Sequence, residues 1–335
     1  MIEVKNLSKK YGDFEAVKDV SFSVGSDQVL GFLGPNGAGK TTVMKILTGY
    51  HYPSAGEVLV DGVSVQEEPV ELKKRIGYLP EGVPLYGDLT VDEYLAFVAE
   101  GRGIPKKRRK EAIDSSLEAC GLKDMRSRLI EQLSKGYKQR AGLAQAIVHD
   151  PAILILDEPT TGLDPNQIIE IRSLIRELGK RKTVILSTHI LQEVEAICSQ
   201  VLILNSGRIA AQGRPEEIAG AMKGGDTWEL ILKGAEIHAL RGALARLAGR
   251  IEGGLRNQET EILDNGLVKA VFFVSASAAE NGERIFDWAI DSSFKILGMN
   301  RKKLSLEDIF VELTHEPPSG NEVSPFPHSN EGGRQ

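Results

Sequence analysis

The residues best suited to chemistry begin with a glycine-rich run at 34–41, which reads Gly-Pro-Asn-Gly-Ala-Gly-Lys-Thr. It follows the apolar segment 29–33 and precedes a segment with helical periodicity, as a phosphate-binding loop does. Glycines let backbone N–H groups converge on phosphate oxygens because no Cβ stands in the way, and the helix N-terminus adds partial positive charge. We therefore expect Lys40 to reach the β- and γ-phosphates of a nucleotide, and Thr41 to offer its hydroxyl to Mg²⁺.

Two adjacent carboxylates, Asp157 and Glu158, follow a second apolar segment at 152–156. Open α/β sheets bind their ligands at the carboxyl ends of such strands. We expect Asp157 on the magnesium side of the nucleotide, and Glu158 to polarise a water for attack on the γ-phosphate. Without the glycine loop this pair would indicate only the end of a strand. With the loop, it predicts nucleotide hydrolysis.

A third candidate is the octapeptide at 133–140, Leu-Ser-Lys-Gly-Tyr-Lys-Gln-Arg, which begins a predicted helix. Ser134 lies near the helix cap, and Ser and Gly at a helix N-terminus form an anion-binding arrangement. Taken alone, the octapeptide fits an ordinary capped helix equally well. The chain therefore has two candidate phosphate-binding helix starts but a single phosphate-loop lysine, Lys40.

Found together and in this order, these motifs resemble those of the nucleotide-binding subunits of ABC transporters, over about residues 2–220. The matching segments are the Walker A motif at Gly34–Thr42, the signature at Leu133–Arg140, the Walker B motif at Ile153–Glu158, the D-loop at Thr161–Asp164 and the switch histidine His189. The resemblance implies an α/β P-loop ATPase domain that binds ATP and Mg²⁺ and hydrolyses ATP.

The resemblance also implies roles for single residues. The catalytic ones are Lys40, Glu158 and His189. The nucleotide-binding ones are Tyr11 (against the adenine), Gly34, Asn36, Gly37, Gly39, Lys40, Thr41, Thr42, Ser134, Gly136, Gln139 and Asp164. The residues expected on the metal side are Thr41, Asp157 and Glu81.

One position departs from the family pattern, because Glu81 stands where the family usually has Gln. A glutamate can ligate Mg²⁺ or orient a water through its oxygens, but it lacks the amide donor. The pair Pro80-Glu81 resembles the ABC-2 export branch, which includes drug, lipid, polysaccharide and gliding-motility systems. The segment Leu306–Thr314 resembles the end of such subunits.

The resemblance implies two kinds of partner. A second ATPase subunit, expected to be an identical copy, would sandwich two ATP molecules head to tail, with Ser134 and Gly136 of one copy facing Lys40 of the other. Hydrolysis would remove the γ-phosphate that both halves grip, with His189 steadying it, so that the pair opens. The region of Glu81 and Tyr86 would carry this motion to an ABC-2 type permease, placing the chain on the cytoplasmic face of the cell membrane.

The elements that must position these residues alternate between strands and helices. Apolar strands are predicted at 29–33, 152–156, 183–187 and 201–204, and helices at 43–47, 137–148, 167–178 and 191–197. Nearly continuous apolar strands belong to sheets covered on both faces, so the pattern predicts an α/β domain with a largely parallel core. Residues 87–135 are predicted to form a helical insertion in this domain.

A second pattern begins after Gly224-Gly225, which indicates a linker. Strands and helices follow in the order βαββαβ, with a hairpin at Asn265-Gly266 and a final helix at Ser305–Leu313, and this order predicts a small ferredoxin-like α+β domain. The domains are therefore expected at 1–222 and 226–315, with a disordered tail at 316–335. The second domain is expected to serve dimer contact or regulation.

The composition of the chain excludes some other functions and partners. The 335 residues are enough for about two domains, and a formal net charge of −6 argues against nucleic acid as a partner. Two cysteines cannot form a disulfide framework, which favours a reducing, cytosolic compartment. The main alternative is a soluble ABC-type ATPase that is not coupled to transport. A small-molecule kinase would not explain the octapeptide, and a non-enzymatic binding module would not need intact Lys40, Glu158 and His189.

Overall fold

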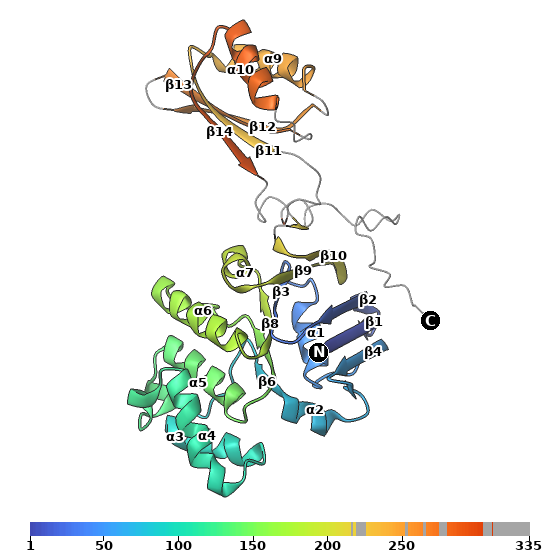
Figure 1. Ribbon diagram of the computed structural model, residues 1–335, viewed down its shortest axis with the longest axis vertical. Helices are drawn as coiled ribbons and strands as arrows, with labels where there is room; N and C mark the ends of the chain where they lie inside the picture. The colour runs from blue at the N-terminus through green and yellow to red at the C-terminus, as the bar shows by residue number, and fades with distance from the viewer. Residues whose placement is uncertain are drawn as a thin grey trace. The chain divides into compact units, whose positions relative to one another are not determined.

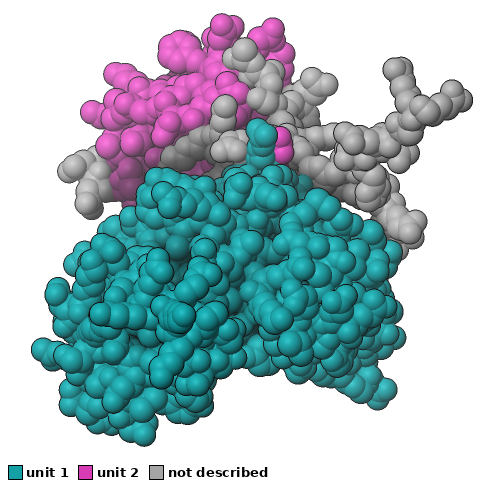
Figure 2. All heavy atoms as spheres, turned by 60° about the horizontal axis from the view of Figure 1, so that its bottom comes forward, with its two compact units in different colours: residues 1–215 teal, residues 216–335 magenta. Residues whose placement is uncertain are grey.

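The computed structural model describes residues 1–215, 217–218, 226–251, 254–263, 266–274, 280–303 and 310. The chain divides into two compact units, 1–215 and 216–335, which Figure 2 colours separately. The predicted linker at Gly224-Gly225, the hairpin residue Asn265, the final helix and the tail at 316–335 lie outside the described residues. Within the described part of the chain, no helix combines the length and the apolar character needed to cross a membrane.

The first unit is built on a six-stranded sheet with the order β10-β9-β3-β8-β7-β6. Its strands are β3 (Val29–Leu33), β6 (Ile76–Leu79), β7 (Ile153–Asp157), β8 (Thr183–Thr188), β9 (Gln200–Asn205) and β10 (Arg208–Gly213). The strands are parallel except for β10, which pairs antiparallel with β9. Every residue of β3, β7 and β8 is buried, as expected for central strands covered on both faces, and the predicted α/β fold is confirmed.

A second, antiparallel sheet in this unit, which is not predicted from the sequence, has the order β2-β1-β4-β5. Its strands are β1 (Ile2–Tyr11), β2 (Phe14–Val24), β4 (Ala55–Val60) and β5 (Val63–Ser64). Helix α1 (Lys40–Leu47) packs between the two sheets, and its apolar side chains share one core with both (Figure 1). The phosphate-binding loop therefore leads into a helix that is fixed on two sides.

Other helices contact the parallel sheet or extend from it. They are α2 (Pro69–Arg75), α5 (Lys135–Ile147), α6 (Pro165–Gly179) and α7 (Leu191–Ile197). The predicted helical insertion contains α3 (Val91–Gly101), α4 (Lys106–Ala119) and short 3₁₀ turns at Lys123–Met125 and Ile130–Gln132. Helix α3 begins with a capping box, in which Thr90 accepts from the Glu93 amide and the Glu93 carboxylate accepts from the Thr90 amide.

The second unit has an antiparallel sheet with the order β12-β13-β11-β14. Its elements are β11 (Asp226–Lys233), α9 (Ile237–Ala248), β12 (Leu255–Leu263), β13 (Leu267–Val274), α10 (Asn281–Asp291) and β14 (Lys295–Lys303). Alternate residues of β11 and β13 are buried against the two helices, in a core that contains Trp228, Phe272 and Trp288. This topology is the predicted ferredoxin-like α+β fold.

Candidate functional site

Several predicted site residues of the first unit lie at or just after the carboxyl ends of neighbouring parallel strands. Gly34 follows β3, Glu81 follows β6, Asp157 ends β7, and His189 follows β8. Because these strands are adjacent and parallel, their carboxyl ends meet at one edge of the sheet. The fold thereby gathers groups that are more than 150 residues apart in the sequence.

The glycine loop enters α1 through a backbone conformation that only glycine adopts easily. Gly39 is the N-cap residue of α1 and has φ +106°. A Cβ on Gly39 would lie 2.6 Å from the carbonyl oxygen of Ala16, so a side chain there would also clash with β2. The sequence of the loop is thus constrained both by its own turn and by the strand packed against it.

Lys40 is the first residue of α1, and its ammonium is buried among oxygens. Its Nζ donates to the carbonyl oxygens of Gly34 at 2.8 Å and Pro35 at 3.3 Å, and it lies 3.6 Å from Oε1 of Glu158. Only 6% of the lysine side chain and 9% of the glutamate side chain are exposed. A buried cation that lost these oxygens would need other anionic partners, and phosphate oxygens are suitable ones.

Asp157 is fixed at the end of β7 by the neighbouring strand. The hydroxyl of Ser187 in β8 donates to its carboxylate, and Oγ1 of Thr41 lies 3.5 Å from the same carboxylate oxygen. Asp157 is 1% exposed, so its orientation is determined by these contacts rather than by solvent. The hydroxyl of Thr41 and the carboxylate of Asp157 form a pair of hard oxygen donors beside the glycine loop.

Glu158 has an unusual backbone and a fully engaged side chain. Its φ is +50°, in the left-handed region, and its N–H donates to the backbone and hydroxyl oxygens of Ser187, both at 3.1 Å. Oε2 accepts from the hydroxyl of Thr161 at 3.2 Å and lies 2.8 Å from Nδ1 of His189. A non-glycine residue in this conformation costs of order 1–3 kcal/mol, and such strain clusters at functional sites. The histidine and the glutamate therefore form a positioned pair.

Lys40, Glu158 and His189 line one cleft of about 490 Å³. Of the predicted site residues, it is lined by Tyr11, Asn36, Gly37, Gly39, Lys40, Thr41, Thr42, Glu81, Glu158 and His189. Three lining residues were not predicted as part of the site: Phe14, Ala16 and Thr161. Tyr11 and Phe14 pair with each other across the turn between β1 and β2, and both rings are exposed. The position of Phe14 in the sequence, three residues after Tyr11, is the signal by which it could have been predicted.

Gly34 and Asp157 lie beside Lys40 and Thr41 without lining the cleft, whereas the other four predicted residues belong to α5 or to the starts of α5 and α6. Ser134 caps α5 by accepting from the Tyr137 amide at 3.4 Å, and Asp164 caps α6 by accepting from the Gln167 amide at 2.9 Å. A Cβ on Gly136 would lie 2.7 Å from the Gln167 side chain, so the two helix starts are packed together. None of Ser134, Gly136, Gln139 and Asp164 lines the cleft of Lys40. A single chain thus holds two separate sets of candidate nucleotide-binding groups.

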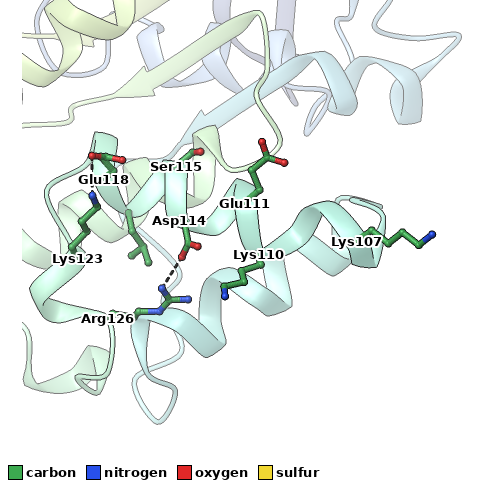
Figure 3. A pocket seen from close by; sticks show the side chains of 9 residues that line it. Lys107, Lys110, Glu111, Asp114, Ser115, Glu118, Lys123 and Arg126 are labelled. Carbon is green, nitrogen blue, oxygen red and sulfur yellow. Dashed lines mark hydrogen bonds and ion pairs between the residues drawn. The ribbon is translucent and has the colours of Figure 1, made fainter.

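A larger hollow of about 780 Å³ lies along α4 in the helical insertion (Figure 3). Both basic and acidic side chains line it, and some of them pair with one another. Arg126 lies 2.6 Å from Asp114, and Lys123 lies 2.8 Å from Glu118. Exposed pairs of this kind contribute little and leave no convergent charge, so this hollow lacks the features of a ligand site.

Comparisons with known proteins agree with this geometry. The protein family described as "ABC transporter" matches residues 17–161. The chain is 33% identical over 317 residues to the uncharacterized ABC transporter ATP-binding protein YxlF of Bacillus subtilis, covering 94% of this chain and 100% of that protein. It is 36% identical over 252 residues to Nod factor export ATP-binding protein I of Rhizobium etli, covering 75% of this chain and 79% of that protein.

Solved structures show the same relationship for the first unit. The dimeric structure of MJ0796, a bacterial ABC transporter cassette, superposes with a TM-score of 0.59 at 26% sequence identity. The match covers 64% of this chain and 98% of that cassette. The relationship to this structure is therefore to a complete cassette, whereas the relationship to YxlF extends over most of the chain.

Proposed function

Because the chain belongs to the family of ABC transporter ATP-binding proteins and is an ATPase, we propose that two copies enclose two ATP molecules and power export through a separate membrane protein. The observation that carries the proposal is the separation of the nucleotide-binding groups into two sets. One set, around Lys40 and Glu158, lines a cleft. The other, around Ser134 and Gly136, lies outside that cleft, where a second copy could use it.

ATP binding would exchange one set of oxygens around Lys40 for another. The ammonium now contacts the carbonyl oxygens of Gly34 and Pro35 and the carboxylate of Glu158. The β- and γ-phosphates would replace part of this set, while backbone N–H groups of the glycine loop hold the remaining phosphate oxygens. The exposed rings of Tyr11 and Phe14 would then provide an apolar surface for the adenine.

The donors present also fit Mg²⁺. The hydroxyl of Thr41, the carboxylate of Asp157 and the nearby carboxylate of Glu81 are hard oxygen ligands, as Mg²⁺ prefers. Among the described residues, no three His, Cys, Asp or Glu side chains form a metal cage, so the ion would share its coordination with phosphate oxygens. When bound, Mg²⁺ would neutralise charge that develops on the phosphates.

Glu158 and His189 would divide the work of hydrolysis. With Lys40 drawn to the phosphates, the Glu158 oxygen that it now contacts is free to accept a proton from an attacking water. The other oxygen remains bonded to Thr161 and His189, so the carboxylate keeps its orientation during the step. His189 would steady the γ-phosphate and the attacking water while its Nδ1 donates to Oε2 of Glu158.

The second set of groups would act across the dimer. The N-terminus of α5, with Ser134 and Gly136, would cap the γ-phosphate held by Lys40 of the other copy. Asp164 and Gln139 would support this surface from α6 and from within α5. Two-fold symmetry repeats the contact at both sites, and loss of the γ-phosphate removes what joins the halves.

An exposed aromatic patch, formed by Tyr86 and Phe97 over Tyr94, supports a membrane partner. The rings of Tyr86 and Phe97 lie 5.5 Å apart, and each residue is more than half exposed. The hydroxyl of Tyr94 lies 3.4 Å from the carbonyl oxygen of Pro84, three residues after Glu81. The patch is thus joined to a loop that lines the nucleotide cleft. We place an ABC-2 type permease on this patch, and therefore the chain on the cytoplasmic face of the membrane.

Export is the direction that the relatives favour, since one of them is named as a Nod factor export protein. We assign residues 1–222 to the ATPase domain and 226–315 to an accessory domain for dimer contact or regulation. The similarity to YxlF over 94% of the chain supports treating both domains as one functional subunit.

The test is affinity purification of the tagged protein from detergent-solubilised native membranes, with ATP and the Glu158→Gln variant. We expect a protein with several membrane spans to co-purify. Lys40→Ala should weaken this recovery, and Phe97→Ser should abolish it. Ile169→Ser, which changes an equally exposed apolar residue on α6, serves as the control. Recovery of ribosomal or DNA-associated proteins alone would instead favour an ATPase that is not coupled to transport.

A further inference from the structure

Glu193, in the first turn of α7, is a fully buried carboxylate that none of the motifs includes. Its side chain is 0% exposed. It accepts hydrogen bonds from two threonine hydroxyls: Oε1 from Thr160, and Oε2 from Thr188 at 2.8 Å. The guanidinium of Arg172, on α6, lies 3.6 Å from Oε1. Both carboxylate oxygens are therefore engaged, and the nearby cation compensates the charge.

The two threonines lie beside the residues proposed to carry out hydrolysis. Thr160 is two residues after Glu158, in the segment that leaves β7. Thr188 is the last residue of β8 and immediately precedes His189. Glu193 thus connects the two segments that present the glutamate and the histidine, and it does so through the two threonines.

The Thr188 hydroxyl also shapes the turn that carries the histidine. It donates to Glu193 and accepts from the Ile190 amide at 3.0 Å, so it spans the backbone on both sides of His189. Ser187 joins β7 and β8 at a second point, through Asp157 and the Glu158 amide. The contact to Glu193 thus adds a further connection between these two segments, besides those made by Ser187 and by the Glu158–His189 pair.

We propose that Glu193 is a positioning residue for ATP hydrolysis, holding Glu158 and His189 in register by binding Thr160 and Thr188 at the same time. The inference rests on the proposed roles of Glu158 and His189. A buried carboxylate is costly to desolvate, and a well-packed apolar residue would fill the same space at lower cost. A carboxylate is suited to this place because it can accept from two hydroxyls at once, one on each oxygen.

The sharpest variant is Glu193→Gln, because it keeps the size of the side chain and removes one acceptor. The amide NH₂ group would face one of the two hydroxyls, which would then lose the acceptor for its proton. We expect kcat for ATP hydrolysis to fall by about 10- to 100-fold, since small displacements of reacting groups have effects of this size. KM and the dissociation constant for ATP should stay within about twofold, because Lys40 and the glycine loop are not touched.

The matched control is Glu195→Gln, which makes the same change two residues along α7 at an exposed position. It should leave kcat unchanged. A second pair of variants acts at the other end of each hydrogen bond. Thr160→Val and Thr188→Val should lower kcat, whereas Thr160→Ser and Thr188→Ser keep the hydroxyl and should restore most of it. This rescue separates loss of the hydrogen bond from a general loss of packing.

A double-mutant comparison tests the route of the effect. If Glu193 acts through the placement of His189, Glu193→Gln should lower the residual rate of His189→Ala by less than threefold. Equal kcat in Glu193→Gln and the wild type, while Glu158→Gln is inactive, would overturn this inference alone. Normal turnover in Glu158→Gln would instead overturn the proposed function on which it rests. If Glu193→Gln does not fold, the threonine pairs give the answer.

Discussion

The carboxylate of Glu158 contacts both the Lys40 ammonium and His189 in the cleft. One carboxylate oxygen lies 3.6 Å from the Lys40 ammonium, and the other is held by Thr161 and His189. Glu158→Gln removes the proposed proton acceptor but keeps the shape of the side chain. We expect kcat to fall by about 10²- to 10⁴-fold, the usual contribution of a general base.

ATP binding should survive this change, so the variant is expected to accumulate an ATP-bound dimer. Retention of radiolabelled ATP on size-exclusion chromatography checks this, with Lys40→Ala as the variant that should retain none. A Glu158→Gln protein that turns over ATP at the wild-type rate would show that another group activates the water.

At this scale the sequence predicts some site residues and misses others for a physical reason. Lys40, Asp157 and Glu158 follow from local signals, because a loop or a strand end determines where each side chain points. Glu193 and Thr160 are 33 residues apart, and only the tertiary fold, in which α7 packs on β8 and α6, brings them together. In the sequence, this contact is indicated only by a Glu next to apolar positions of a predicted helix.

The proposed phosphate binding depends on the entry into α1. Gly39 combines φ +106° with a close approach to the Ala16 carbonyl, so Gly39→Ala requires both a strained backbone and displacement of β2. We expect the free energy of unfolding to fall by about 1–3 kcal/mol and ATP affinity to be lost. Urea unfolding and ATP titration measure the two effects.

The control for this change is Gly37→Ala. Gly37 also has a positive φ, +81°, but a Cβ there would meet no atom within 4 Å. This variant should show the backbone cost without the clash. Equal losses in the two variants would mean that contact with β2 is unimportant.

His149, two residues after the end of α5, connects this helix to β6 and makes the free energy of unfolding depend on pH. Its Nε2 lies 3.1 Å from the Ile76 carbonyl oxygen, so the neutral ring donates from this nitrogen. Burial, followed by the positive charge of Arg102, lowers the pKa of His149 from 6.5 to about 4. The unfolded chain therefore binds a proton that the folded chain refuses, and stability is lost as the pH falls from about 6.5 towards 4.

His149→Gln keeps a donor for the Ile76 carbonyl and removes the titrating ring. We expect its free energy of unfolding to depend less on pH between 6.5 and 4 than that of the wild type, with little difference above pH 7. Urea unfolding across this range checks the expectation. His51→Gln, which changes a histidine that does not contact β6, is the control. If the free energy of unfolding depends on pH in the same way in the wild type and in His149→Gln, the expectation is contradicted.

The two sheets of the first unit differ in how far the sequence predicts them. The strands of the parallel sheet are short, apolar and fully buried, so their composition alone indicates them. The antiparallel sheet is not predicted because its pairing is irregular. Strands β1 and β2 shift register after Val4, Leu7 and Lys9, and Asn6 and Asp19 have positive φ. These bulges interrupt the alternation of polar and apolar residues by which a half-buried strand is recognised.

At the scale of the whole molecule, two copies are needed to complete each proposed site. Lys40→Ala should disable the cleft of its own copy, and Ser134→Arg the cap that its copy offers to the partner. Each variant alone should be inactive. An equimolar mixture should recover about a quarter of the wild-type rate, because half of the pairs are mixed and each mixed pair has one intact site of two.

Measuring ATPase rates against the mixing ratio tests this directly. A mixture of Lys40→Ala with Lys40→Gln provides the control, because no pairing of these two variants restores a site. If a mixture of Lys40→Ala and Ser134→Arg stays inactive, both sets of groups in a chain act on the same nucleotide, and the proposed sharing between two copies is wrong.

The two tryptophans of the chain, Trp228 and Trp288, both lie in the core of the second unit, where the indole of Trp288 donates to the Ala243 carbonyl at 2.8 Å. The first unit has tyrosines but no tryptophan. Selectively excited indole fluorescence is therefore an optical label, already in place, for the second unit alone. Unfolding followed by this emission and by nucleotide binding would give a separate record for each half of the chain, with no dye attached.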